Sequence, residues 1–543
     1  MAVDRGSELS PTAPDPAEAV ASSRPPAAIV APTLLHAALA ATGHSEDGAS
    51  LAAKSSADPT RNRAAVASSI MARFLDATTV REALVALFGE LPAVGKSEIA
   101  AELNRQAGLL DVAINRQLNA ILHHPGFQRL EASWRGLKYL HDCAIAEDDA
   151  KVVIRVLSAT RRELERDFER AAEFDRSHLF QKVYEAEFGS PGGRPYGVLI
   201  TDLDMRPFSS PDYPYDDLSI LRSLAQVGAA AFCPVIASAH PSIFALDDFS
   251  DMDHRLNHAE TFERKDYLHW RSLRDAEDSR FLGLVLPRVL MRAPYADDGT
   301  RVDRFCFHED VTGPDRSKHL WGSAAYALGG VLIRAFAAAG WLADIRGVRR
   351  DEEGGGIVPP LAQCDFRTDS PGITPRSSTE INVTDDLERQ LSDLGFIPLS
   401  HCPDTDLAAF YSVPSLQKPK KYDRAVATTN ARISALLQHI FCASRFAHYV
   451  KVIGRDKIGK LIEAGEIENE LQRWITKYVT ADSEATRAVK ARRPLREANV
   501  SVQAVEGKPG AFRCEMHLVP HYELDELATS IQLKTELSPP RTQ

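Results

Sequence analysis

The segment GELPAVGKS, residues 89–97, comes nearest in this chain to a nucleotide-binding motif. A phosphate-binding loop has the pattern GxxxxGK[ST], because successive backbone N–H groups must converge on one phosphate. Here five residues separate the two glycines, one more than the pattern allows, and Pro92 removes a backbone donor. The preceding residues also predict a helix, whereas such a loop follows a strand. We therefore interpret Lys96-Ser97 as the start of the next helix, and a nucleotide-binding enzyme with a degenerate P-loop is the alternative function.

The adjacent residues His123 and His124 could bind a metal ion or take part in catalysis. Histidines that bind one metal from a helix usually stand at i and i+4, whereas adjacent residues point to different faces. Pro125 disfavours helical geometry at His124, and Gly126 allows a turn. The pattern favours a helical hairpin, with a hinge between two packed helices, over a metal site.

Other patterns typical of catalysis are missing from the sequence. It contains no HExxH, GxSxG or CxxC motif, and its 17 histidines form no cluster with ligand spacing. Asp202 and Asp204 in ITDLDM follow a predicted strand and could hold a metal, but a surface turn is the simpler interpretation. The sequence thus predicts no catalytic, cofactor-binding or metal-binding residues, no cofactor, and a protein that is not an enzyme.

The composition is that of a large acidic chain with enough apolar residues for a sizeable core. It has 543 residues, 44% of them hydrophobic, and a formal net charge of −11. This balance argues against nucleic acid as the main partner, since phosphate binding needs a concentrated positive surface. The seven cysteines lie far apart, which predicts reduced thiols. The N-terminus lacks the apolar run of a signal peptide, and no stretch approaches ~18 apolar residues, so we expect a soluble, cytoplasmic protein with no direct membrane insertion.

Four regions follow one another along the chain. Residues 1–65 are rich in Ala, Ser and Pro and contain no Phe, Tyr or Trp, which predicts a disordered tail with one possible helix at 33–43. Residues 66–150 predict a helical N-terminal region. Residues 151–415 alternate short apolar runs with helices, as in a central α/β domain. Residues 416–543 begin with a helical block and end in strands.

Apolar side chains recur at helical spacing through the second region. The runs extend from Ile70 to Leu87 and from Leu103 to Ile121, and a third follows the Pro-Gly pair. In the third run, the apolar residues at helical spacing are Phe127, Leu130, Trp134, Leu137 and Leu140.

The central region predicts a mixed or parallel sheet flanked by helices, because strands and helices alternate along it. Helical patterns lie at 217–229 and 320–338. The candidate strands are 152–157, 196–201, 231–237, 281–286, 341–346, 380–384, 397–401 and 408–412.

The last region predicts an antiparallel sheet after a helical block. The block covers about 427–479 with breaks near Gly454 and Gly465, and the strands are 499–505, 512–519 and 530–537. Apolar residues alternate along these strands, which is typical of a half-buried antiparallel sheet. The fold class is therefore mixed α/β.

Seven segments, in order along the chain, together resemble one protein family, and the resemblance runs from about Leu34 to Leu537. They are LNAILHHPGFQRLEASWRGLKYL, WRSLRDAEDSRFLGLVLPRVLMRAPY, KHLWGSAAYAL, LSDLGFIPL, SLQKPKKYD, SRFAHYVKVIGRDKIG and ARRPLREANVSVQAVEGKPGAFRCEMHLVPHYELDELATSIQLKTEL. They are similar to the large contractile-sheath subunit of bacterial type VI secretion systems, the TssC/VipB/EvpB family. Each segment alone is a weak signal, because none has a catalytic geometry that could be checked. Their colinear order along the chain makes the resemblance specific.

This resemblance implies a contractile-tail-sheath-like fold and a structural function. Family members pair with a small sheath subunit of the TssB/VipA type, polymerise with copies of themselves around an inner tube of the Hcp type, and contract against a baseplate. Their C-terminal sheet is open to strand exchange between subunits, which here implicates Val500, Val502, Cys514, Met516, Leu518, Ile531 and Leu533. An accessory sheath paralogue is a further alternative.

The N-terminal segment PTLLHAALAATG occupies the position of a helix that, in some family members, is bound by a recycling AAA+ unfoldase of the ClpV type. The resemblance implies that Leu34, Leu35 and Leu39 would be its apolar anchors. The alternative is an apolar segment within a disordered tail.

Overall fold

A computed structural model describes residues 73–88, 96–147, 152–190, 192–254, 257–297, 299–300, 305–312, 316–348, 354–363, 377–402, 405, 407–457, 463–482, 484–505, 511–521 and 531–537. The predicted tail at 1–65, with Leu34, Leu35 and Leu39, lies outside these residues, and so does the loop at 89–95. Among the residues described, no helix is both long and apolar enough to span a membrane.

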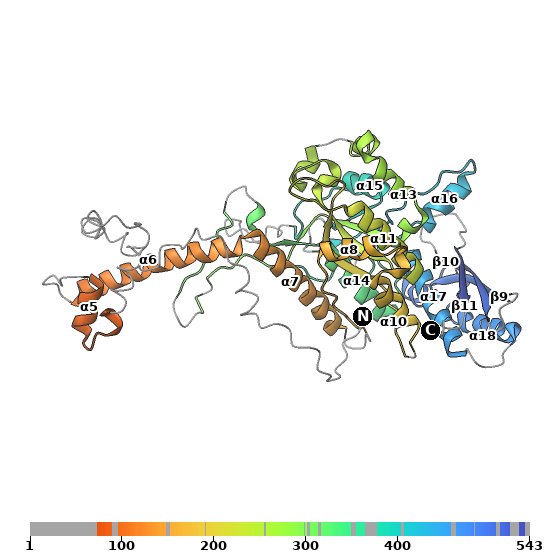
Figure 1. The fold of residues 1–543 in the computed structure, drawn as a ribbon, viewed down its shortest axis with the longest axis horizontal. Helices are drawn as coiled ribbons and strands as arrows, with labels where there is room; N and C mark the ends of the chain where they lie inside the picture. The colour runs from red at the N-terminus through yellow and green to blue at the C-terminus, as the bar shows by residue number, and fades with distance from the viewer. Residues whose placement is uncertain are drawn as a thin grey trace. The chain divides into compact units, whose positions relative to one another are not determined.

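The chain divides into two compact units (Figure 1). The described residues of Arg129–Ala293 and Leu320–Gln543 form the larger unit, and those of Arg5–Gln128 and Pro294–His319 form the smaller one. The finer division at residues 65, 150 and 415 stays a prediction.

The smaller unit contains α5 (Val80–Phe88), α6 (Lys96–Leu122) and a 3-10 turn at Arg316–Lys318. Lys96 is the first residue of α6, which confirms that Lys96-Ser97 begin a helix. The predicted continuous helix from Ile70 to Leu87 is wrong, because a new helix starts at Val80. A capping box causes the break: the Glu82 N–H donates to Thr79 Oγ1, and the Thr79 N–H donates to Glu82 Oε2, both at 3.2 Å.

A parallel sheet lies at the centre of the larger unit, as the alternating pattern predicted. Its strands are β1 (Leu199–Met205), β2 (Val235–Ala239), β3 (Leu282–Leu286) and β6 (Phe396–Pro398), in that spatial order. Every residue of β2 and β3 is buried, as expected for a parallel sheet that is covered on both faces.

Helices cover the two faces of this sheet, and alternate strand residues belong to different cores (Figure 1). Ala237 and Leu284 lie in one core with α11 (Asp217–Ala231), α13 (Leu268–Asp275) and α15 (Asp385–Asp393). Ile236 and Val285 lie in the other core with α14 (Ala324–Ala339) and the start of α17 (Leu437–Lys457). The period of two along each strand thus distributes its side chains between the layers.

The remaining elements of the larger unit complete these layers. The helices are α7 (Pro125–Ala146, of which the residues from Arg129 belong to this unit), α8 (Arg161–Arg170), α9 (His178–Phe180), a π-helical turn (Gln181–Glu185), α10 (Ala186–Phe188), α12 (Ala259–Glu263), α16 (Ala425–Ser434), α18 (Ala464–Thr476) and α19 (Arg487–Arg492). The 3-10 turns are Phe174–Arg176, Pro241–Phe244, Phe249–His254, Lys265–Tyr267 and Glu277–Phe281. The strands are β4 (Val289–Leu290), β5 (Trp321–Gly322), β7 (Ser400–His401), β8 (Ala408–Ala409), β9 (Leu495–Ala504), β10 (Phe512–Pro520) and β11 (Ile531–Leu537).

Several predicted elements differ from the structure. Residues 152–157, 341–346 and 380–384 form no named strand. The middle segment is apolar because it fills a core: Trp341 stacks on Phe446 with ring centroids 4.2 Å apart, and Ile345 is fully buried. A short apolar segment that is buried but does not pair with a strand therefore has the same sequence pattern as a buried strand. The predicted break near Gly454 is wrong, because Gly454 lies inside α17, whereas α18 begins at Ala464, beside Gly465, where the other break was predicted.

The helix α7 buries mainly small residues, and of its apolar run at helical spacing only Leu140 is fully buried. Its buried residues are Ala132, Gly136, Leu140 and Cys143, whereas Leu130 is 58% exposed and Trp134 is 65% exposed. A Cβ on Gly136 would lie 2.3 Å from the Tyr326 ring of α14, so small residues on α7 allow the two helices to approach closely. Two apolar faces thus run along this helix, and the large side chains of Leu130 and Trp134 are on the exposed one.

We expect Gly329→Val to destabilise the larger unit. A Cβ at Gly329 in α14 would lie 2.6 Å from Leu140 Cδ2 and 2.8 Å from Ile200 Cδ1, so these buried side chains must shift or α14 must move away from α7 and β1. Overpacking of this kind costs about 1–3 kcal/mol in the free energy of unfolding. Chemical denaturation followed by circular dichroism measures the loss. Gly108→Val is the control, because Gly108 also lies in a helix and has open space around its Cβ position; equal losses at both sites would contradict the close packing.

Candidate functional site

The C-terminal strands form a three-stranded antiparallel sheet in the order β11-β10-β9 (Figure 1). The strands extend the predicted ones by at most a few residues. Cys514 pairs with Val502 on one side and with Thr535 on the other, and Met516 pairs with Val500 and Leu533. The predicted antiparallel sheet is therefore confirmed.

The side chains that the sequence singled out on β9 and β10 lie inside the chain's own core. Val500, Val502, Cys514, Met516 and Leu518 are 4%, 6%, 0%, 0% and 1% exposed. They pack with Phe446 of α17 and with Leu471 and Ile475 of α18. Ile531 and Leu533 lie on β11 and pair with Leu518 and Met516. Any contact of this sheet with another chain must therefore use its backbone edges or its other face.

The outer edge of β9 is occupied by side chains of α18. The Val500 N–H donates to Gln472 Oε1 at 2.9 Å, and Gln472 Nε2 donates to the Ala498 carbonyl at 3.0 Å. The Val502 N–H donates to Glu468 Oε2 at 2.8 Å. The backbone groups of these β9 residues thus point away from β10.

The register then fixes the direction of the backbone groups of β11. Hydrogen-bonded and non-hydrogen-bonded pairs alternate in an antiparallel ladder, so the pairs that Val500 and Val502 make with β10 are of the non-hydrogen-bonded kind. The N–H and C=O groups of their β10 partners must face β11. The backbone groups of Gln532, Lys534 and Glu536 consequently face away from β10. In the part of the chain that the structure describes, no strand pairs with this edge of β11.

A stripe of apolar side chains on α7 is a second exposed feature. Leu130, Trp134 and Ile145 are 58%, 65% and 59% exposed. At 100° per residue they fall on one side of the helix, opposite the face that packs on α14. Tryptophan is the residue type most often found at the energetic centre of protein interfaces, which makes this stripe a candidate contact surface.

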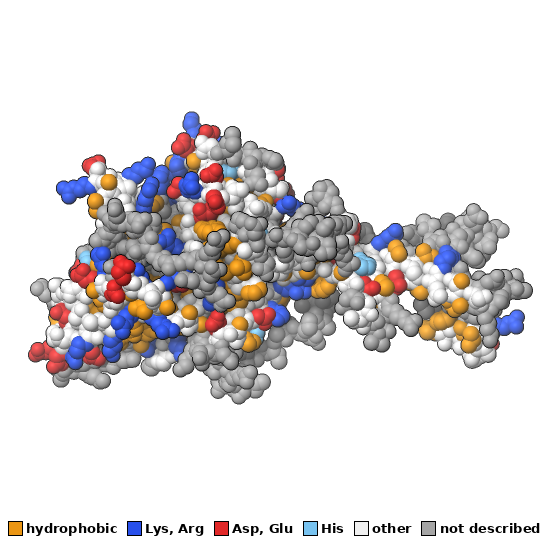
Figure 2. Space-filling view, turned by 180° about the vertical axis from the view of Figure 1, so that it is seen from behind, with side chains coloured by type: hydrophobic (Ala, Val, Ile, Leu, Met, Phe, Trp, Pro, Cys, Tyr) orange, Lys and Arg blue, Asp and Glu red, His pale blue; other side chains and the backbone are white. Residues whose placement is uncertain are grey.

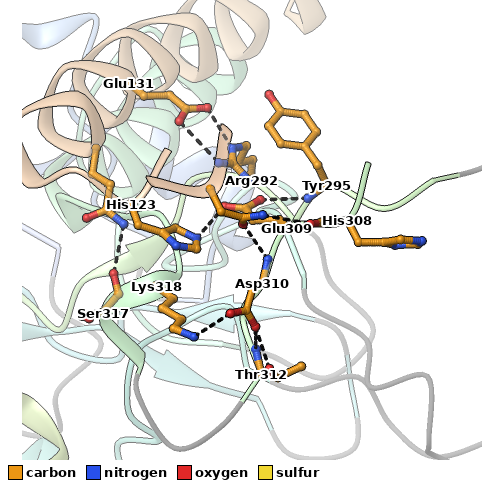
Figure 3. Close-up of polar contacts among 12 residues, drawn as sticks. His123, Glu131, Arg292, Tyr295, His308, Glu309, Asp310, Thr312, Ser317 and Lys318 are labelled. Atoms are coloured by element: carbon orange, nitrogen blue, oxygen red, sulfur yellow. Dashed lines mark hydrogen bonds and ion pairs between the residues drawn. The ribbon is translucent and has the colours of Figure 1, made fainter. Parts of the chain in front are cut away.

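The two adjacent histidines make different local contacts. His124 Nδ1 accepts the N–H of Gly126 at 3.1 Å and so closes the turn before α7. His123 Nε2 lies 3.5 Å from Glu309 Oε1 (Figure 3). Because α6 ends at Leu122 and α7 begins at Pro125, the predicted helix break is confirmed. The antiparallel packing of these two helices stays a prediction.

Glu309 and Asp310 hold the segment around them by separate contacts (Figure 3). Buried Glu309 accepts the Tyr295 N–H at 2.9 Å. Asp310 accepts the Thr312 hydroxyl at 2.6 Å and lies 3.1 Å from Lys318 Nζ. The Thr312 hydroxyl and Lys318 hydrogen bonds lower the pKa of Asp310 to about 2. The Asp310 side chain is therefore ionised at neutral pH, in a form that hydrogen-bonds its neighbours.

Two asparagines of α6 bind the same segment along its backbone. Asn115 Nδ2 donates to the Cys306 carbonyl at 2.9 Å, and Asn119 Nδ2 donates to the His308 carbonyl at 3.2 Å. The Asp310 N–H donates to Asn119 Oδ1 at 2.7 Å. Side chains four residues apart on a helix thus contact alternate residues of an extended segment. Neither asparagine was predicted to have a role, although asparagine is a poor helix former and two of them at i and i+4 in a helix are a signal in the sequence.

The structure describes the residues that were weighed as metal ligands, whereas the loop weighed for nucleotide binding lies outside the described residues. Among them, no group of three or more His, Cys, Asp or Glu side chains could hold a metal ion. Asp202 and Asp204 lie on β1 instead of in a turn after it, so the surface-turn interpretation is wrong. Burial raises the pKa of Asp204, and Asp202 accepts a hydrogen bond from Ser133.

The charged side chains in view are mixed in sign. On the face drawn in Figure 2, the described Lys and Arg side chains are interspersed with Asp and Glu and form no single positive surface. This distribution is typical of a solvated protein surface.

Two family models and a similar protein of known name all indicate the same family. Residues 104–417 match the family model "EvpB/VC_A0108, tail sheath N-terminal domain", and residues 426–537 match "EvpB/VC_A0108, tail sheath gpW/gp25-like domain". The type VI secretion system sheath protein TssC1 of Pseudomonas aeruginosa is 40% identical over 433 residues, which cover 79% of this chain and 84% of that protein. A solved structure of the anti-feeding prophage baseplate has a TM-score of 0.30 and 8% identity over 57% of this chain and 62% of that chain, a similarity too low to carry a structural argument.

Proposed function

This chain belongs to the VipB/EvpB family of tail sheath proteins and is a large contractile-sheath subunit of the type VI secretion system, and we propose that it acts through assembly, without bond-making chemistry of its own. The observation that carries the proposal is the match of two consecutive sheath domains from residue 104 to residue 537. Energy for contraction would then be stored in the lattice, because the extended and contracted sheaths are two packings of the same subunits.

The proposed partners follow from this function. The chain pairs with a small sheath subunit of the TssB/VipA type, polymerises with copies of itself around an inner tube of the Hcp type, and contracts against a baseplate in the cytoplasm. Recycling by an unfoldase of the ClpV type would use Leu34, Leu35 and Leu39.

Strand exchange at the C-terminal sheet is the proposed link between subunits. The buried positions of Val500, Val502, Cys514, Met516 and Leu518 support a stable receiving sheet more than direct side-chain contacts with another subunit. The ladder of backbone groups at Gln532, Lys534 and Glu536 is where we place the added strand. Such a ladder supplies about 0.5–1.5 kcal/mol net for each hydrogen bond, and side chains set the register.

Co-expression with the small sheath subunit tests the proposed function. We expect a stable heterodimer that assembles into tubes visible by negative-stain microscopy. A chain that stays monomeric at micromolar concentration beside its small subunit would contradict the proposal.

The exposed stripe of α7 is a proposed contact for the small subunit or a neighbouring copy, and we expect Trp134→Ser to weaken assembly. Truncating an interface tryptophan costs about 2 kcal/mol or more, at least a tenfold loss of affinity. Because Trp134 is 65% exposed, folding should be unaffected. Sedimentation of assembled sheath against protein concentration measures the change.

Lys138→Ser is the control for this prediction. Lys138 is also exposed on α7, and its ion pair with Asp142 is a surface contact of small energetic value. Its assembly should stay within about twofold of the unmodified chain. Equal assembly of the Trp134 and Lys138 variants would remove α7 from the interface.

A further inference from the structure

Without the side chains of α18, the outer edge of β9 would be open to pairing with another strand. An edge strand exposes a row of N–H and C=O groups, and such a row is a template for pairing with any extended segment. At Ala498, Val500 and Val502 these groups face away from β10. A sheath subunit that adds strands to its sheet during assembly carries a particular risk here, since two edges could receive a strand.

Glu468 and Gln472 reproduce what a paired strand would offer to this edge. The amide of Gln472 both accepts from the Val500 N–H and donates to the Ala498 carbonyl, as the C=O and N–H of one residue in a neighbouring parallel strand would do. Glu468 accepts from the Val502 N–H. Residues at i and i+4 of a helix are separated by about 6 Å along its axis, and alternate residues of a strand by about 6.8 Å. One helix face can therefore serve successive outward-facing residues of a strand.

The rest of α18 keeps these two side chains in place. Ile467, Leu471 and Ile475 are 6%, 1% and 0% exposed and anchor the helix in the core beneath the sheet. The chain after α18 then covers the start of β9: the Thr480 N–H donates to the Leu495 carbonyl at 2.9 Å, and the Leu495 N–H donates to the Tyr478 carbonyl at 3.3 Å.

The smaller unit uses the same device for a different segment. Asn115 and Asn119, also at i and i+4, bind the backbone of residues 306–310 through their side-chain amides. Helix side chains at i and i+4 thus bind backbone groups of a neighbouring segment in both units of this chain.

We propose that Glu468 and Gln472 form a stop that mimics a strand and closes the β9 edge, so that an added strand can extend this sheet only on the β11 side. The direction of sheet growth then becomes a property of the subunit itself. The proposal rests on the proposed sheath function for the origin of the added strand, but the closure of β9 is independent of it. When the stop is removed, the occupant of the opened edge is the β9 edge of a second copy, because two identical edges can pair about a two-fold axis.

The test uses the full-length chain without its small subunit and the variant Glu468→Ala/Gln472→Ala. We expect a folded protein whose self-association rises with concentration in light scattering, under conditions where the unmodified chain does not self-associate to the same extent. Amide exchange at Val500 and Val502 should be at least tenfold faster at concentrations where the variant is still monomeric. The control is Glu466→Ala/Asn469→Ala, which removes one carboxylate and one amide from exposed positions of the same helix and should behave as the unmodified chain.

Conservative variants separate the stop from a merely structural role. Glu468→Gln retains an acceptor for the Val502 N–H and should keep the edge closed. Gln472→Glu places a second acceptor against the Ala498 carbonyl and should open it, even if the double alanine variant fails to fold. Unchanged exchange at Val500 and Val502 in Gln472→Glu, or no added self-association in the folded double variant, would overturn the proposal. Because these measurements omit the small subunit, failure of the sheath function would show only in the co-expression experiment.

Discussion

Lys534→Pro should leave this chain folded and able to pair with its small subunit, yet reduce tube formation at least tenfold. The register places the Lys534 N–H on the outer side of β11, away from β10, so a proline there removes no hydrogen bond within the sheet. Proline is tolerated on an edge strand when its missing N–H faces outward, but it cannot donate to a strand that is added later. Negative-stain counts of tubes at matched heterodimer concentration measure the effect.

Two controls define what the Lys534 result means. Lys534→Ala keeps the backbone donor and should form tubes normally, so any effect of the lost charge is measured separately. Thr535→Pro removes a donor that faces Cys514 of β10 and should destabilise the sheet itself. Normal tubes from a folded Lys534→Pro heterodimer would show that added strands do not use the β11 edge.

The central sheet and the C-terminal sheet could be predicted because their signals are local. The β3 segment and the strands β9 and β10 are short apolar or alternating runs, and each lies within a few residues of its predicted range. Side chains along a strand alternate between the two faces of the sheet, and this period of two is visible in the sequence.

The edge contacts could not be predicted, because they depend on which elements are neighbours in space. Glu468 and Gln472 look in the sequence like the solvated face of an amphipathic helix. Their role becomes visible only when β9, which begins more than 20 residues later, is placed beside α18. The same holds for α7, where Trp134 is the obvious core residue by type. The small-residue face of α7 is the buried one because it packs against Gly329 and Gly330 on α14, which lie far along the chain.

The largest expected loss of stability comes from Asp217→Ala at the start of α11. The Asp217 side chain is fully buried. Its carboxylate accepts from Arg161 and, at 2.8 Å each, from the Arg206 N–H and the Tyr213 hydroxyl. Removing it leaves the guanidinium of Arg161, whose side chain is 14% exposed, without its ion-pair partner. Breaking a buried ion pair in this way costs about 3–5 kcal/mol in the free energy of unfolding, and denaturant titration followed by circular dichroism measures it.

The neighbouring residue supplies a matched control, because Asp216 is the N-cap of the same helix and differs from Asp217 mainly in burial. Asp216 Oδ1 accepts only the Ser219 N–H, at 3.2 Å, among the hydrogen bonds of the described residues. Loss of an N-cap costs about 1 kcal/mol, so Asp216→Ala should be the milder change by a factor of three or more in free energy, roughly the ratio of those two costs. In a double-mutant cycle, Arg161→Ala should cost less in the Asp217→Ala background than alone, since the unpaired charge is gone. Equal losses at Asp216 and Asp217, or strict additivity with Arg161, would mean that this carboxylate does not join α8, α11 and the residues after β1 into one polar cluster.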